Sequence, residues 1–170
     1  MQPLKWSTTH AVFVTEIDDE HKRIFQAVAG LQKALMSPEA LPEIRSATQR
    51  LVSCIVEHFA HEERLMRATR YGSTHWHKHQ HSHAHLRVGQ FVLRIEQGDI
   101  KAGHELVGYL TSWLHEHTRL ADRMLGAFLR NQQRCMWKLT FQAGTKPIDA
   151  CAWMDSNGNK FDPHLNENGG

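Results

Sequence analysis

Hydrophobic residues recur at helical spacing in four stretches of the chain, with short breaks between them. The first stretch carries its apolar face at Ile24, Phe25, Val28, Leu31 and Leu35. We expect this helix to begin at Asp18, whose carboxylate can cap free N–H groups, with Ile17 packing as a hydrophobic staple. The Ser37-Pro38 pair predicts its end, and residues 1–17 form an N-terminal arm.

Two further stretches carry apolar residues at the same helical spacing. The second helix is expected to begin near Pro42, a favoured first-turn residue, and to close at the Tyr71-Gly72 pair. Its apolar positions are Ile44, Leu51, Ile55, Phe59, Leu65 and Met66. The third helix should start at a cap formed by Ser73 or Thr74 and run to about Gln97.

The fourth stretch completes the pattern. The Gly98-Asp99 pair combines a helix stop with a new cap, and the next helix is expected from Ile100 to Arg130. Its inward positions are Leu106, Leu110, Trp113, Leu114, Leu120, Leu125 and Phe128. Four amphipathic helices with short connections predict an all-α, up-down-up-down four-helix bundle over residues 18–130. Such bundles hold metal sites in the core, between side chains of facing helices.

Residues 131–170 differ in character from the bundle. Helix-breaking residues stand at Gly144, Pro147, Asn157, Gly158 and Pro163. The segments Trp137–Phe141 and Ala150–Met154 favour short strands joined by a turn. We therefore expect a short, irregular C-terminal extension that contains a small hairpin.

Composition narrows the class of protein. A chain of 170 residues, 41% apolar and 22% charged, suits one globular domain plus an appendage. Its net charge of +2 includes no basic block, so we expect no nucleic-acid or membrane partner. No signal peptide is evident, nor an apolar run of the roughly 18 residues that a membrane helix needs. Three cysteines without paired spacing describe no disulfide framework, which favours a soluble, cytoplasmic protein.

Histidine is the outlier in this composition, because the chain has 14 and six of them lie between His75 and His85. Five histidines and two carboxylates divide over the four predicted helices as candidate metal ligands. They are His21, His58, Glu62, His77, His81, His117 and Asp122. The second and third helices each offer a pair four residues apart, which shares one helix face. His117 and Asp122 are five apart, about 140° around an α-helix, and we expect a bridging carboxylate to use that offset.

This donor set suits two iron ions. Imidazole binds iron, zinc, copper and nickel, whereas carboxylates favour harder ions. A structural zinc site takes four ligands, usually including cysteine, so the set exceeds one zinc. Glu62 and Asp122 can bridge two ions. Together with a bridging oxo or hydroxo group they offset most of the charge of two Fe(II) ions, which an apolar bundle requires.

The motifs around these positions resemble the hemerythrin family. The resemblance rests on Ile17–His21, His58–Met66, Tyr71 with His77 and His81, and Trp113–His117 with Asp122. All four motifs occur in order over about residues 6–130, and every ligand position is filled. The chain looks like a bacterial single-domain hemerythrin, a di-iron oxygen-binding protein.

The resemblance also implies a division of labour between the two irons. One iron is held by His77, His81 and His117. The other is held by His21 and His58, and it keeps one position open. In that family the open iron takes up dioxygen reversibly when its pocket stays dry. The candidate apolar walls of this pocket are Phe59, Trp113 and Leu114.

These expectations lead to a non-enzymatic function with dioxygen as the ligand: oxygen carriage, storage or delivery. One alternative is an oxygen or redox sensor that signals to a protein partner through residues 131–170, which deletion of that segment would test. Another is a di-iron enzyme acting on peroxide or nitric oxide. The donor set disfavours it, because oxygen-activating bundle sites are richer in carboxylate and repeat a Glu-x-x-His motif.

The remaining histidines leave alternatives open. His75, His79 and His83 form a stripe of four-residue steps beside the ligand face. The stripe suits either a second, surface metal site or a solvated polar face. His85, one turn past the ligands, suits closing the pocket end or hydrogen-bonding a neighbour. His61 lies four residues past Glu57 and predicts a surface pair.

Thr118 stands where the hemerythrin family usually has a branched aliphatic residue, directly after the histidine of the fourth helix. A hydroxyl near the bound oxygen can donate a hydrogen bond or admit water. We therefore predict faster autoxidation in the wild-type protein than in a Thr118→Ile variant, measured as the decay of the oxygenated spectrum. Equal decay rates would contradict this role for the hydroxyl.

Overall fold

The described part of the chain is a helical bundle. The structure is a computed structural model that describes residues 4–37 and 41–142. Its long helices are α1 (Thr15–Ala34), α2 (Leu41–Ala68), α3 (Thr74–Glu96) and α4 (Ile100–His117). A short 3₁₀ turn, η1 (Thr8–His10), precedes them. A π-helical turn, η2 (Thr118–Asp122), joins α4 to α5 (Arg123–Gln142).

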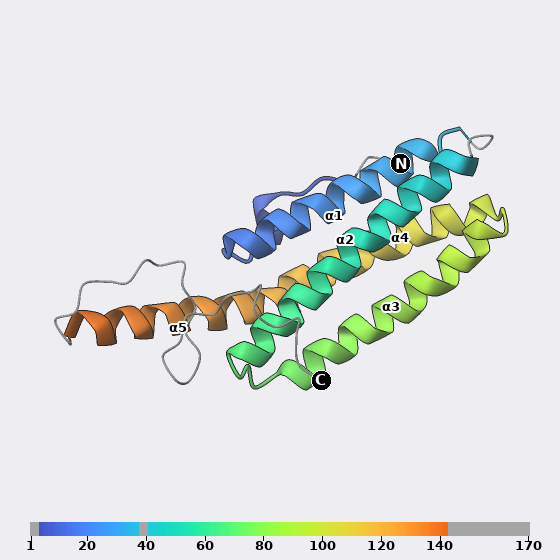
Figure 1. Cartoon of the computed structure of the whole chain (residues 1–170). Coiled ribbons are helices and arrows are strands. Elements are labelled where there is room, and N and C mark those ends of the chain that lie inside the picture. The colour runs from blue at the N-terminus through green and yellow to red at the C-terminus, as the bar shows by residue number, and fades with distance from the viewer. Residues whose placement is uncertain (1–3, 38–40, 143–170) are drawn as a thin grey trace, which may run out of the picture. The chain divides into compact units, whose positions relative to one another are not determined.

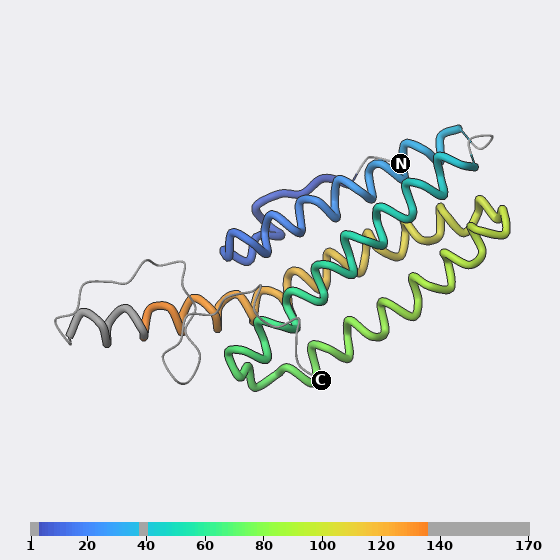
Figure 2. The backbone as a smooth tube through the Cα atoms, in the orientation of Figure 1, coloured from blue at the N-terminus to red at the C-terminus, as the bar shows by residue number. Residues whose placement is uncertain are grey.

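The helices pack in the order of the chain. α1 packs on α2, α2 on α3, α3 on α4, and α4 closes the ring against α1. Figure 1 shows that each helix runs back along the one before it, so the predicted up-down-up-down bundle is confirmed. α4 passes through η2 into α5 without a break in its path (Figure 2). Among the described residues, no helix combines the length and apolar character needed to cross a membrane.

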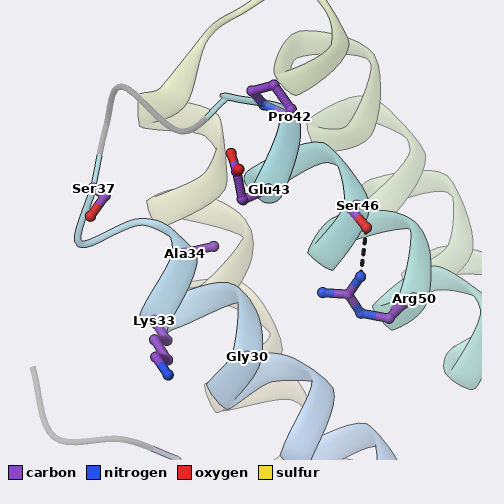
Figure 3. A pocket seen from close by; sticks show the side chains of 8 residues that line it. All are labelled: Gly30, Lys33, Ala34, Ser37, Pro42, Glu43, Ser46 and Arg50. Carbon is purple, nitrogen blue, oxygen red and sulfur yellow. Dashed lines mark hydrogen bonds between the residues drawn. The ribbon is translucent and has the colours of Figure 1, made fainter.

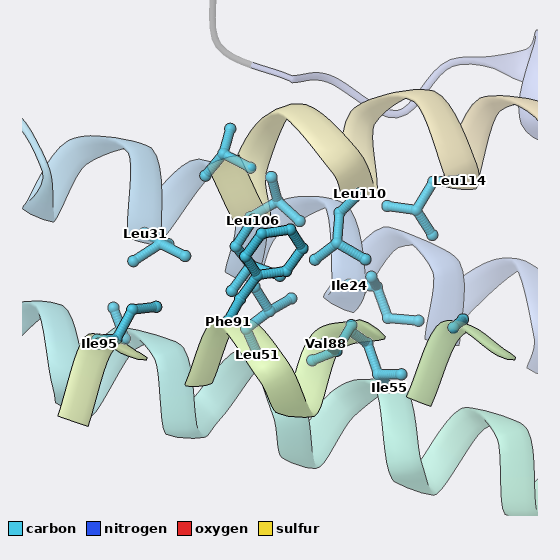
Figure 4. Close-up of a cluster of buried hydrophobic side chains, with 14 of the residues drawn as sticks. Ile24, Leu31, Leu51, Ile55, Val88, Phe91, Ile95, Leu106, Leu110 and Leu114 are labelled. Atoms are coloured by element: carbon cyan, nitrogen blue, oxygen red, sulfur yellow. The ribbon is translucent and has the colours of Figure 1, made fainter. Parts of the chain in front are cut away.

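The predicted periodicity places the core except at Leu120, which was expected to face inward but is 57% exposed, because it lies in the wider π-helical turn η2. Side chains from all four helices interdigitate between them, including Leu31 of α1, Leu51 of α2, Phe91 of α3 and Leu110 of α4 (Figure 4). These four are at most 4% exposed, and the apolar cluster extends along the bundle to Leu114. A close-packed apolar layer of this kind supplies most of the stability of a helical bundle, because it removes one face of every helix from water.

The connection between α3 and α4 has the predicted form. Gly98 has φ of +89°, the left-handed conformation that favours glycine after a helix. Asp99 follows as the cap of α4, and its Oδ1 accepts a hydrogen bond from the Ala102 N–H at 3.3 Å. Arg94 donates to Asp99 at 2.9 Å and to Glu105 at 2.6 Å, which ties the end of α3 to the start of α4.

The start of the first helix differs from the prediction. α1 begins at Thr15 rather than Asp18, and its N-cap position, Val14, has no capping side chain. The Asp18 carboxylate instead accepts hydrogen bonds from the Val12 and Phe13 N–H groups, at 2.8 and 3.0 Å. Asp18 thus lies inside the first turn and fastens the arm, because the chain folds back over the helix that it precedes.

The C-terminal expectation is wrong for one of its two strands. Trp137–Phe141 lies within α5, which continues to Gln142. Extending an existing helix adds one hydrogen bond for each residue fixed, whereas a hairpin has to be nucleated, so helical continuation overrides the strand preference of these residues. Ala150–Met154 lies outside the described residues. The chain divides into two compact units, Met1–Arg130 and Asn131–Gly170.

Two arginine side chains of α5 fasten the N-terminal arm by hydrogen bonds to its backbone carbonyls. Arg123 donates to the carbonyls of Thr9 and Ala11 at 3.2 and 3.3 Å, and Arg130 donates to the carbonyl of Val12. The arm comes so close that a Cβ on Gly126 would lie 2.6 Å from the Val12 oxygen. A glycine is therefore required where the arm crosses α5.

We predict that Gly126→Ala lowers the free energy of unfolding by about 1–3 kcal/mol, because the added methyl group overlaps a backbone oxygen. Urea denaturation measures the change. Gly108→Ala is the matched control, since Gly108 lies within α4 and no neighbouring atom lies within 4 Å of the position that its added methyl group would take. Alanine there should stabilise the helix by about 0.5–1 kcal/mol. Equal effects of the two substitutions would contradict the close crossing.

Candidate metal centre

Seven buried side chains bring their ligand atoms together in two overlapping groups. The first group is Glu62, His77, His81, His117 and Asp122. The second is His21, His58, Glu62 and Asp122. Within each group the ligand atoms lie within 4.8 Å of one another, and both groups share the two carboxylates. The structure therefore brings together all seven predicted candidates.

Each helix of the bundle contributes for a local reason. α2 and α3 offer pairs four residues apart, so both members face the bundle axis. α1 contributes only His21, which is fully buried. The apolar residues between the ligands follow the same face, so the burial that forms the bundle also gathers the polar cluster.

His117 and Asp122 meet because the helix is not a regular α-helix between them. Residues Thr118–Asp122 form a π-helical turn, with wider i→i+5 spacing. Residues five apart then lie one above the other, and His117 Nε2 lies 3.0 Å from Asp122 Oδ1. The expected 140° offset in a continuous α-helix is therefore wrong. The five-residue ligand spacing was itself the signal for a widened turn.

The ligand atoms have the separations of donors around a common ion. Asp122 Oδ2 lies 3.1 Å from His21 Nε2, and Asp122 Oδ1 lies 3.1 Å from His77 Nε2. Glu62 Oε2 lies 3.3 Å from the Nε2 atoms of His77 and His81, and 3.8 Å from that of His58. An ion about 2.1 Å from each donor holds neighbouring donors about 3 Å apart.

Hydrogen bonding leaves several of these atoms unsatisfied. Both carboxylate oxygens of Glu62 and Asp122, and both ring nitrogens of His21 and His81, are buried without a well-formed hydrogen bond. Buried polar atoms without partners are costly, and native structures contain few of them. Many such oxygen and nitrogen atoms gather at this one point, all within ligand distance of one another. This arrangement fits a site in which a bound metal takes the place of hydrogen-bond partners.

The local electrostatics favour a cation. Burial raises the pKa of Asp122, but the nearby His117, His21 and His77 imidazoles outweigh burial and hold it well below its usual range. Burial and Asp122 likewise raise the pKa of Glu62, and the imidazoles around it bring the net pKa below normal. Both carboxylates are therefore ionised at neutral pH and available as ligands.

The imidazoles of the site differ from one another. Burial alone would lower the pKa of His77, but the carboxylates of Asp122 and Glu62, 3.1 and 3.3 Å from its Nε2 atom, raise it to about 9. Burial dominates at His81 and lowers its pKa, which leaves a neutral ring at neutral pH. A bound cation displaces the proton from a ligand imidazole, so metal uptake at this site releases protons.

A carboxylate lies behind one ligand on the His21 side, and sequence reasoning missed it. Glu20 Oε2 lies 3.1 Å from His58 Nδ1, which leaves the Nε2 atom of that ring for a metal. Glu20 Oε1 accepts from His61 Nδ1 at 2.6 Å, so His61 pairs here rather than with Glu57. Burial raises the pKa of Glu20, but these two histidines lower it to about 2.

A second carboxylate lies behind the three-histidine group. Glu63 Oε1 is 3.6 Å from His81 Nδ1, and its other oxygen pairs with Lys78 at 2.8 Å. Both outer carboxylates come from positions next to a ligand, directly before His21 and directly after Glu62. That adjacency is the sequence signal by which they could have been found.

Aromatic rings cover the three-histidine side. Phe59 stacks on His81, with ring centroids 3.9 Å apart and planes at 7°. Trp113 stacks on His117 at 4.1 Å and 17°. Phe59 and Trp113 were expected to line the pocket at the His21/His58 iron, but both stack on ligands of the three-histidine group. The Phe59 ring also lies 5.8 Å from the His58 ring, and Leu114, 2% exposed, fills the core next to them.

Thr118 is buried, and its hydroxyl is already engaged. The Oγ1 atom donates to the Leu114 carbonyl at 2.7 Å, one turn back in α4. The hydroxyl proton is therefore not free to donate to a bound ligand. Of the two roles expected for Thr118, the hydrogen bond to bound oxygen is thus wrong. Its oxygen still has a lone pair that can accept a hydrogen bond from water.

The histidines outside the ligand set are distributed differently from the ligands. His75, His79, His83 and His85 are all exposed on α3, so His85 does not close the pocket end. His10, to which the sequence assigned no role, is buried in the arm, where its Nδ1 accepts from the Ser7 N–H at 3.3 Å.

A hollow lies between the end of α1 and the start of α2, lined by Lys33 and Arg50 (Figure 3). None of the seven ligands lines it.

Comparison with known proteins agrees with this geometry. Residues 12–129 match the family model of the hemerythrin HHE cation binding domain. The chain belongs to the hemerythrin family. It is 33% identical to a bacteriohemerythrin of Pseudomonas aeruginosa over 122 residues, which cover 72% of this chain and 78% of that protein.

More distant hemerythrins show the same relationship. Myohemerythrin-1 of Phascolopsis gouldii is 27% identical, over 71% of this chain and 90% of its own. A crystal structure of a leucine-to-tyrosine mutant of hemerythrin superposes with a TM-score of 0.70 at 23% identity, and it covers 76% of this chain and 98% of that one. That likeness extends the agreement to the fold.

We predict that Glu62→Gln loses most of its bound metal, because an amide cannot supply the bridging anion that both ligand groups share. Metal content per chain, measured by elemental analysis after purification, tests this. Glu57→Gln is the matched control, since Glu57 is an exposed glutamate on the same helix. Full metal content in both variants would contradict the shared-carboxylate geometry.

Proposed function

We propose that this hemerythrin-family protein binds dioxygen reversibly at a non-haem di-iron centre and serves in oxygen carriage, storage or delivery. The observation that carries the proposal is the division of the buried donors into unequal groups that share two carboxylates. One group has three histidines and the other has two. The unequal count leaves one ion short of a protein ligand, and that position is open to a small molecule.

The proposed ligands follow the two groups. His77, His81 and His117 would hold one iron, and His21 and His58 the other, with Glu62 and Asp122 between them. When bound, the iron pair supplies the redox electrons and the open position for dioxygen. The donor types support iron, because imidazole and carboxylate together suit an ion of intermediate hardness.

The protein's own residues keep the site dry and ordered. The stacked Phe59 and Trp113 rings exclude water from the three-histidine side. Glu20 fixes the orientation of His58 on the two-histidine side, since a hydrogen bond to Nδ1 sets the ring plane and its tautomer. A dry, preorganised pocket favours release of dioxygen over loss of a reactive species.

The relatives support a binding function over an enzymatic one. The chain resembles proteins named bacteriohemerythrin and myohemerythrin over most of their lengths. The two-carboxylate donor set also differs from the carboxylate-rich sites of oxygen-activating bundles. A sensing role rests on a separate observation: the chain continues to residue 170, beyond the family match, which ends at residue 129.

The test is aerobic purification followed by metal analysis and visible spectroscopy. We expect about two irons per chain, and a visible absorption band that disappears under vacuum and returns with oxygen over repeated cycles. The Glu62→Gln variant should lack the band. Zinc in the site would contradict the proposal, as would multiple-turnover consumption of peroxide or nitric oxide in place of reversible uptake.

A further inference from the structure

The outer face of α3 carries histidines that the core centre does not use. His77 and His81 are buried and face the bundle, whereas His75, His79 and His83 are exposed. Histidines at alternate positions of one helix point to opposite faces, because two residues span about 200°. One sequence run thus supplies a buried pair of ligands and a separate exposed stripe.

The exposed stripe has chelating geometry. Four residues advance an α-helix by about 400°, so His79 lies one turn above His75 with little rotation. Their Cβ atoms are then about 5–6 Å apart, within reach of one shared ion. The same i, i+4 histidine spacing on a helix binds zinc in metalloproteases.

The surroundings of this pair do not oppose a cation. His75 and His79 line one open hollow, together with Lys78 and Ser82, and His83 does not line it. The Lys78 ammonium lies 2.8 Å from Glu63 Oε2, so a carboxylate of α2 offsets its charge. The hollow therefore presents two imidazoles to solvent without an uncompensated positive charge between them.

We propose that His75 and His79 form a second, surface site for one borderline transition-metal ion, of the class of Zn²⁺, Ni²⁺ or Cu²⁺. Two imidazoles and no carboxylate disfavour Mg²⁺ and Ca²⁺, which take oxygen ligands. The ion keeps water in its remaining positions, because the site is open to solvent. The site is separate from the di-iron centre and does not depend on the proposed function.

The test is isothermal titration of the full-length, iron-loaded protein with Zn²⁺. We expect one zinc per chain beyond the core metal. His75→Ala and His79→Ala should each weaken zinc binding at least about tenfold, since each removes half of the chelate. His83→Ala should leave the affinity within about twofold, because His83 does not line the hollow that His75 and His79 share.

His104→Ala is the matched control. His104 is an exposed histidine of α4 with no histidine four residues away, so its loss should not change zinc binding. Iron content is measured before and after titration. The proposal is overturned if His75→Ala and His79→Ala bind zinc like the wild type, or if zinc uptake is matched by iron release. Failure of the oxygen test would leave this result unchanged, since the zinc count is taken beyond the metal that the core already holds.

Discussion

Glu62 and Asp122 are fully buried anions in the middle of an apolar bundle, and the rest of the structure depends on how their charge is balanced. Burying an isolated carboxylate costs far more than one domain's net stability. Five imidazoles converge on these two side chains from all four helices. The helices therefore have to meet in one register, because a slip of one helix would leave a buried charge without a partner.

That constraint explains the layering around the centre. Beyond the ligands, Glu20 and Glu63 lie against the outer nitrogens of His58 and His81. Beyond these carboxylates come partly exposed groups such as His61 and Lys78. Charge alternates from anion to imidazole to anion to a surface donor, so each buried polar group is adjacent to a group of complementary character. Apolar residues fill the length of the bundle away from this column.

The sequence predicted most of what local periodicity controls. The inward faces, the stop at Gly98 and the pairs at His58/Glu62 and His77/His81 all follow from spacing along one helix. The parts that it did not predict depend on contacts between distant segments. Asp18 fastens the arm, and no neighbouring residue indicates that contact. Glu20 contacts α2, and its one local signal is its position directly before His21.

Two further features show why pattern reading has a limit. The strand expected at Trp137–Phe141 follows residue preference, but the helix already under way continues through it. The widened turn at Thr118–Asp122 breaks the assumption of a constant helical period. A period fitted to apolar residues cannot register a single wide turn, because residues on both sides of it remain helical. The five-residue spacing of His117 and Asp122 carried that information, but it was interpreted as an offset within a regular α-helix.

The wide turn is the form that one additional residue takes in an otherwise regular helix. Removing one residue between His117 and Asp122 would let the helix close into a regular α-helix, with the two ligands four residues apart and still on one face. Every later residue would keep its direction, so the buried Leu125 and Leu129 would stay on the faces that they now cover. Adding a residue elsewhere in α4, by contrast, would rotate every later residue by about 100°. This segment can therefore lose a single residue and leave the rest of the helix in phase.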